Sequence, residues 1–203
     1  MKIKILSFVS ILIFIGCSAY NQYHASWISS DRFPPKSNLK VAVLPFTAPK
    51  PGKSSSALMT GATESTTHEN AGETVADAVT MALMAVPNIS LIERSKLKHI
   101  LEEHRLTLNG IIDNPDLNLL ATILPVDALI IGNVTSFCWW TSGINWGSTV
   151  SFTGKLIDIH SGEILSTFNC SAILHNGEAG EMARSLANDA IKKSLKQYPP
   201  PKT

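Results

Sequence analysis

The sequence is poor in cysteine, in charged residues and in long apolar runs, and each shortage excludes a class of protein. Three cysteines in 203 residues are too few for a disulfide scaffold. The apolar stretch from Ile5 to Ile15 has eleven residues, about half of the roughly 20 that cross a bilayer as a helix. Hydrophobic side chains make up 44% of the chain and charged ones 16%, so disordered and collagen-like proteins are excluded and one globular domain is expected.

The charge balance argues against a nucleic-acid partner. There are 17 basic and 16 acidic side chains, a formal net charge of +1. Removal of residues 1–16 would take away Lys2 and Lys4 and leave 15 basic side chains, a net charge of −1. Nucleic-acid binding relies on an excess of Lys and Arg, so the chain has no electrostatic reason to bind DNA or RNA.

The N-terminus has the pattern of an export signal. A short basic region with Lys2 and Lys4 precedes the apolar stretch, which ends at Gly16 and Cys17. A stretch this short, with these flanks, is typical of a signal peptide over residues 1–16 and not of a membrane anchor.

The junction at Cys17 resembles the bacterial lipobox, although Phe14 stands where Leu is usual. The resemblance implies that Cys17 is the lipidation site and carries three acyl chains, palmitate among them. Because Ser18 is not Asp, it also implies sorting to the outer membrane, on the periplasmic face. A plain secretory signal with an incidental cysteine is the alternative.

The segments around the predicted domain have little apolar periodicity. Residues 17–38 carry Pro34 and Pro35 and are predicted to form a lipidated tether. Residues 47–71, rich in Ser, Thr, Gly, Pro and Asn, are predicted to form a long loop. Residues 198–203 are predicted to form a disordered tail, which leaves residues 39–197 for the domain.

Hydrophobic periodicity within residues 39–197 predicts an α+β fold, with helices packed on a mixed β-sheet. Three β-rich runs in series predict an antiparallel three-strand meander. In chain order the predicted elements are a strand at 39–46, a helix at 72–86, a strand at 89–93, helices at 97–108 and from Asn114 onward, strands at 126–137, 149–159 and 163–172, and a helix at 178–197.

The meander also predicts the state of two cysteines. Reflection across the two turns places Cys138 opposite about Val150 and Cys170 opposite Phe152, on either side of the same strand. Two strand spacings, about 9.6 Å, exceed the roughly 7 Å that a disulfide spans. The two thiols are therefore expected to be free.

The motifs that would carry catalysis or metal binding fail on spacing. The triplet from Gly52 to Ser54 resembles part of a phosphate-binding loop, but Thr47 stands where that motif needs Gly. His99 and His104 are five residues apart, which places them on different faces of a helix. The chain is therefore predicted not to be an enzyme, and no cofactor or metal site is expected.

Trp139, Trp140 and Trp146 gather at one predicted hairpin. Such residues often pack across or under a hairpin as part of a core. Alternatively, they form an exposed aromatic patch that binds a partner or touches the membrane interface, since Trp is enriched in both settings. We take these three residues as the candidate partner-binding site.

Three stretches, in this order and spacing, resemble the CsgG family of curli secretion lipoproteins, their LpoB-type relatives and the TolB amino-terminal-like fold. They are residues 40–46, residues 78–103 with Glu93-Arg94 at their centre, and residues 126–132 continuing to 156–158 and 161–165. The resemblance covers most of residues 39–197. In that family these features are structural, so no catalytic residue is implied.

One departure from this family bears on function. CsgG pore subunits contribute long amphipathic hairpins to an outer-membrane barrel, whose strands need about 9–11 residues each. Here 12 residues separate Phe137 from Val150, and the chain after Cys170 soon enters the last helix. The sequence thus resembles the periplasmic body of such a subunit without its pore.

The favoured function is that of a non-enzymatic outer-membrane lipoprotein. It would serve as an assembly or adaptor factor for an envelope protein complex of the secretion, flagellar or cell-wall synthesis machinery. The alternative is a subunit of an oligomeric CsgG-like secretion channel. The expected partners are that complex and, through the lipid, the membrane, and a homo-oligomer is left open.

If Cys17 carries the lipid, a Cys17→Ser variant should lose metabolic palmitate label and leave the membrane fraction, because no acyl chain remains to hold it. Radiolabelling and fractionation of cells that express either protein would measure both effects. Unchanged membrane retention of the variant would contradict the anchor.

Overall fold

The structure, a computed structural model, describes residues 22–58, 61–104 and 117–197. The predicted signal peptide, Cys17 and the predicted tail at 198–203 lie outside these residues. Along the chain the elements are β1 (Tyr23–Ser29), β2 (Leu39–Val43), β3 (Gly52–Leu58), β4 (Gly61–Thr67), α1 (Ala71–Leu83), β5 (Ile89–Ile92), α2 (Arg94–Glu103), α4 (Leu117–Ile123), β6 (Ala128–Ser142), β7 (Asn145–Asp158), β8 (Ile164–His175) and α5 (Ala179–Gln197).

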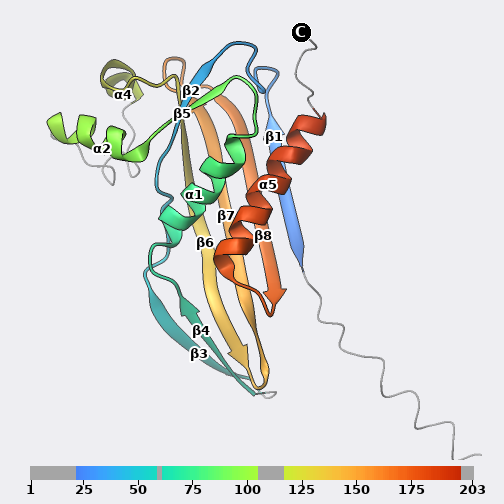
Figure 1. Cartoon of the computed structure of the whole chain (residues 1–203). Helices are drawn as coiled ribbons and strands as arrows, with labels where there is room; N and C mark the ends of the chain where they lie inside the picture. Colours follow the sequence, from blue (N-terminus) through green and yellow to red (C-terminus); the bar gives the residue numbers. More distant parts are fainter. Residues whose placement is uncertain (1–21, 59–60, 105–116, 198–203) are drawn as a thin grey trace, which may run out of the picture.

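The described strands form one mixed sheet with the order β1-β8-β7-β6-β2-β5, and a β3–β4 hairpin joins it through β4 and β6 (Figure 1). β6, β7 and β8 are the predicted antiparallel meander. β2 pairs in parallel with both β5 and β6. The predicted α+β fold, with helices on a mixed sheet, is confirmed.

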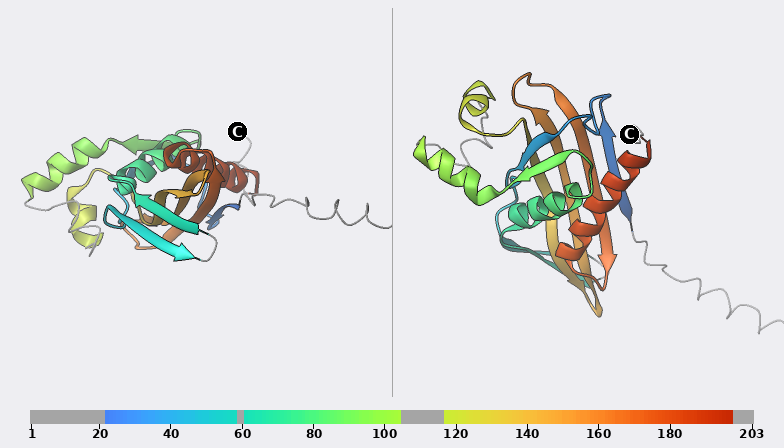
Figure 2. Two further views of the ribbon diagram at one scale, coloured as in Figure 1. Left: turned by 90° about the horizontal axis from the view of Figure 1, so that it is seen from below. Right: turned by 45° about the horizontal axis from the view of Figure 1, so that its top comes forward.

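The core lies on both faces of β2, as its nearly continuous apolar sequence predicts. Val41 and Val43 belong to the large cluster that α1 and α5 cover on one face of the sheet. Ala42 and Leu44 belong to a smaller cluster with Leu97 of α2 and residues of α4 on the opposite face. Figure 2 shows α2 and α4 together beside the β5 end of the sheet, apart from α5.

Residues 22–38 belong to the folded domain, so the prediction of a tether over that part of the chain is wrong. β1 pairs antiparallel with β8 from Tyr23 to Ser29. Trp27 is buried and stacks on Phe168 with the ring centroids 4.6 Å apart, and Phe33 packs against Trp27 at 5.7 Å. Burying these two aromatic rings outweighs the weak strand pattern of the segment.

Polar contacts also fix this N-terminal segment to distant parts of the chain. The Tyr23 hydroxyl donates to the Asp189 carboxylate of α5 at 2.7 Å. Lys193 of the same helix donates to the Ala25 carbonyl at 3.1 Å. Arg32 donates to Asp158 at 3.0 Å and also pairs with Glu163, which joins the segment after β1 to both ends of the β7–β8 turn.

A second correction concerns residues 47–71, which were predicted to be a loop. They contain the β3–β4 hairpin, and β4 pairs antiparallel with the outer half of β6, from Thr67 opposite Cys138 to Thr63 opposite Ser142. The triplet Gly52 to Ser54 thus opens a strand. Backbone pairing with β6 places this Ser- and Thr-rich segment in the sheet.

The β6–β7 hairpin is longer than predicted. Its strands pair up to Ser142 opposite Asn145 and leave a two-residue turn, Gly143 and Ile144, where the sequence suggested about a dozen unpaired residues. Gly143 has φ +61°, a value that turns of this length require at such a position and that glycine adopts without strain.

The two cysteines flank β7, as expected. Cys170 lies opposite Phe152, as predicted, whereas Cys138 lies opposite Thr149 and not Val150. The difference of one residue arises because the turn is centred between Gly143 and Ile144 and not on Ile144. Both thiols are free.

Trp27→Ala should lower the free energy of unfolding by about 3–5 kcal/mol, because it opens a cavity beneath Phe168. Trp27→Phe should lower the free energy of unfolding by less than half as much, because an aromatic ring remains. This variant also removes the buried indole N–H, which has no hydrogen-bond partner among the described residues. Urea denaturation followed by circular dichroism measures both values. The control is Ile28→Ala, because Ile28 is the neighbouring residue and is 67% exposed. An equal fall in the free energy of unfolding in this variant would contradict the assignment of Trp27 to the core.

The two thiols should differ in reactivity. Burial raises the pKa of the Cys170 thiol to about 12, so its thiolate is scarce at pH 8, whereas Cys138 is partly exposed. A thiol reagent at pH 8 should therefore modify Cys138 rapidly in the folded protein and both residues in denaturant without reductant. Absence of titratable thiol in denaturant would contradict the strand order.

Candidate binding site beside the tryptophan hairpin

The outer halves of β6 and β7 extend past the ends of α1 and α5, beside the β3–β4 hairpin (Figure 1). Strand alternation decides where their side chains point. Phe137 is buried on the face that α1 and α5 cover, so Trp139, two residues on, lies on the same face. Trp146 pairs with Thr141, four residues after Phe137, and shares that face too.

The structure brings together two of the three predicted tryptophans. Trp139 and Trp146, 40% and 39% exposed, line one pocket. Trp140 lies on the opposite face, where its ring approaches the position that a Cβ of Gly147 would occupy and meets His175 edge-on at 5.0 Å. The prediction of a single patch of three tryptophans is therefore wrong for Trp140, because neighbouring residues of a strand face opposite sides.

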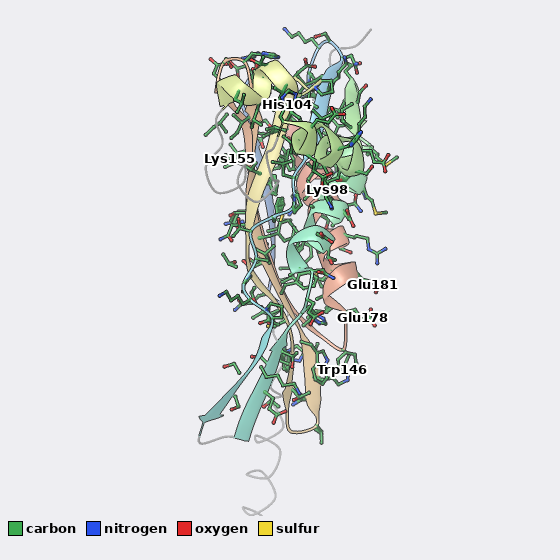
Figure 3. All side chains as sticks on the ribbon, turned by 90° about the vertical axis from the view of Figure 1, so that its left-hand side faces the viewer. Lys98, His104, Trp146, Lys155, Glu178 and Glu181 are labelled. Atoms are coloured by element: carbon green, nitrogen blue, oxygen red, sulfur yellow. The ribbon has the colours of Figure 1, made fainter. Side chains whose placement is uncertain are left out.

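The pocket that Trp139 and Trp146 line has a volume of about 410 Å³. It lies between the hairpin, the segment before α1 and the start of α5, and Figure 3 shows Trp146 below Glu178 on the side of α5. The lining residues are His68, Glu69, Thr74, Phe137, Trp139, Trp146, Ser148 and residues 177–180.

Backbone and side-chain hydrogen bonds hold the walls of the pocket in place. The His68 N–H donates to the Phe137 carbonyl at 3.1 Å, and the Asn176 N–H donates to the Trp146 carbonyl at 3.1 Å. The buried Ser148 hydroxyl donates to the Gly177 carbonyl at 2.7 Å. These bonds join the segments before α1 and α5 to the hairpin, so the aromatic surfaces are preorganised.

The chemistry of the lining favours a ligand that carries positive charge on an apolar body. Glu69 and Glu178 are exposed carboxylates, and the lining contains no Lys or Arg. Indole faces attract ammonium and guanidinium groups through their quadrupoles. The aromatic faces and the two carboxylates together suit the binding of such a group.

The sequence identified two of these residues and missed the others. Trp139 and Trp146 stood out through their rarity, but His68, Glu69 and Glu178 follow no motif, and Glu178 lies more than 100 residues after the other two. Only the pairing of β4 with β6, and the direct passage from β8 into α5, place them together.

A second hollow, of about 490 Å³, lies on the face of the sheet that α1 and α5 leave uncovered. Ser26, Thr153, Thr167 and Asn169 supply hydroxyl and amide groups, and Lys155 is the charged member of the lining. Within the described residues, no group of three or more His, Cys, Asp or Glu side chains could hold a metal ion. No helix in the described ranges is long and apolar enough to cross a membrane.

A family model described as "Curli production assembly/transport component CsgG" matches residues 22–180. The match begins at Gln22 and so includes β1, in agreement with its place in the sheet. No match to the chain is found among curated proteins.

Several solved structures are similar in fold. The lipoprotein GNA1162 from Neisseria meningitidis matches with a TM-score of 0.56 and 16% identity, over 78% of this chain and 99% of that one. A PelC dodecamer from Paraburkholderia phytofirmans matches with a TM-score of 0.51 and 13% identity, over 90% of this chain and 100% of that one. At these identities the similarity establishes the fold alone.

Proposed function

Because the chain belongs to the CsgG family, as its sequence suggested, we propose that it is a non-enzymatic lipoprotein of the bacterial outer membrane. It faces the periplasm and acts as an assembly or adaptor factor for an envelope complex of the secretion, flagellar or cell-wall synthesis kind. The family match and the similarity to the lipoprotein GNA1162 support the envelope location. The pocket beside the tryptophan hairpin supports a binding role.

The pocket would receive a Lys or Arg side chain from the partner protein. Its ammonium or guanidinium group would lie on the faces of Trp139 and Trp146, within reach of Glu69 or Glu178. A cation–π contact contributes about 0.5–2 kcal/mol, and buried aromatic residues often dominate an interface. Because the walls are fixed by hydrogen bonds before binding, little conformational entropy would be lost.

The lipid at Cys17 would restrict this recognition to the membrane surface. Three acyl chains exceed the two signals needed for stable anchoring. Gln22, the first described residue, is five positions after Cys17, so the domain would remain close to the lipid headgroups.

The alternative, a subunit of an oligomeric secretion channel, is favoured by the two hairpins that extend side by side past the helices (Figure 1). The similar PelC structures are described as dodecamers. A ring of copies needs two different surfaces that meet head to tail. β1 and β5 end the sheet on opposite sides, and within the described residues neither has a strand beyond it.

Substitution of Trp139 and Trp146 together by Ser should abolish most capture of the envelope partner from crosslinked cells, with at least a roughly tenfold loss expected for two central aromatic contacts. Trp140→Ser is the matched control, since this tryptophan lies in the same hairpin on the opposite face. Glu69→Gln with Glu178→Gln should weaken capture less and make it insensitive to salt. Quantitative mass spectrometry of the crosslinked lipidated protein measures the partner captured by each of the three variants.

The thermal midpoint decides whether such a loss reflects binding. It should stay nearly unchanged in the Trp139/Trp146 variant, because both side chains are substantially exposed. A large fall in the midpoint, or equal loss of capture with Trp140→Ser, would contradict the binding site. Native mass spectrometry of the detergent-extracted protein would reveal a ring if the channel alternative holds.

A further inference from the structure

The long hairpin has no charged residue in its outer part. From Ala128 to Gly154, 27 consecutive residues include no Asp, Glu, Lys or Arg, in a chain that is 16% charged. Exposed strands and turns of a water-soluble surface usually carry charge. The outer end of this segment lies beyond α1 and α5 and forms no part of the central core (Figure 1).

The turn at the end of the hairpin presents an isoleucine to the solvent. Ile144 is 98% exposed, the largest exposure among the exposed large hydrophobic residues of the described chain. Its partner in the turn, Gly143, supplies the positive φ, so the geometry does not call for an apolar residue at 144. Asn145 and Ser142 on either side are uncharged as well.

The chain enters the sheet near this end. The Gln22 carbonyl accepts a hydrogen bond from the Ile173 N–H at 2.9 Å, and Ile173 lies opposite Thr149 of β7. Ile144 is five residues from Thr149, so the turn projects about 17 Å beyond that row of the sheet. Cys17 is also five residues from Gln22, and a fully extended segment of that length reaches about 17 Å.

The projection of the turn and the reach of the segment from Cys17 to Gln22 are equal, and together they limit which part of the domain faces the membrane. A lipid-bound Cys17 holds the membrane surface within about 17 Å of Gln22, which is the distance to which the turn projects. The opposite end of the sheet, at Ile164, is nine residues from Ile173, about 30 Å away and beyond that reach. If Cys17 carries the lipid, the hairpin end of the sheet would therefore lie nearer to the membrane than the Ile164 end.

We propose that the turn at Gly143 and Ile144 contacts the headgroup region of the membrane that holds the lipid anchor, with the Ile144 side chain inserted among the headgroups. The proposal rests on lipidation of Cys17, which belongs to the proposed function. Insertion of an apolar residue to a depth of about 5–10 Å is typical of interfacial contacts.

Phospholipid is favoured as the ligand of the turn because the turn presents an exposed apolar side chain with no charge to desolvate, within reach of the anchor. Among the described residues, the charged side chain nearest to the turn in strand register is Glu64 of β4, opposite Thr141. The pocket that holds Glu69 and Glu178 opens beside the hairpin, toward α5, and stays available to a protein partner.

The test places a fluorophore at the turn of the full lipidated protein. Ile144→Cys in a Cys138→Ser background is labelled with an environment-sensitive dye, and Cys170 is buried and unreactive. The matched control is Ile164→Cys, since Ile164 is 51% exposed at the opposite end of the sheet. Both proteins are reconstituted into phosphatidylethanolamine–phosphatidylglycerol vesicles that contain a headgroup-nitroxide lipid, and palmitate label is measured on the same samples.

Quenching at position 144 should be at least roughly twofold stronger than at position 164, as expected for a residue among the headgroups. Equal or absent quenching at 144 in a palmitate-labelled, vesicle-bound protein would overturn the membrane contact and leave the anchor intact. Absence of palmitate would overturn the anchor, and the contact proposed on its basis would fall with it.

Discussion

The backbone pairing of β6 with β7 is the interaction on which the rest of the structure depends. Fourteen residue pairs join the two strands from Ala128 opposite Asp158 to Ser142 opposite Asn145. At one end this ladder carries the core, with Ile130 and Leu156 beneath the helices. At the other it carries the uncharged turn, so core and exposed end belong to one rigid element.

The core elements could be predicted from the sequence because their signals are hydrophobic. The apolar run of β2 indicated a strand covered on both faces, and two apolar clusters cover it. β1 and the β3–β4 hairpin were missed for different reasons. β1 has a weak strand pattern. Its buried ring, Trp27, packs on Phe168, more than 100 residues away, and on Phe33 in the following loop. The side chains of β3 and β4 that the structure describes, at 52–55 and 64–67, are not buried and so produce no apolar pattern.

The candidate site was only partly predictable, for a geometric reason. Composition drew attention to three tryptophans, but strand alternation places Trp140 on the other face from Trp139. The carboxylates of Glu69 and Glu178 join the site through strand order, which one sequence does not reveal. The predicted register placed Cys138 opposite Val150, one residue from its observed partner Thr149. A shift of this size exchanges the faces of one strand's side chains relative to those of the other.

The attachment of β1 also determines how the domain would bear mechanical load. Tension on the segment before Gln22 would act along β1, across its seven residue pairs with β8. Interstrand hydrogen bonds lie perpendicular to the strands, so such a force shears the whole ladder at once and does not open it pair by pair. The ring of Trp27 against Phe168 and the bond from Lys193 to Ala25 resist the same displacement. β1, at the edge of the sheet, would thus resist tension on the N-terminal segment in shear and transmit it to the body of the domain.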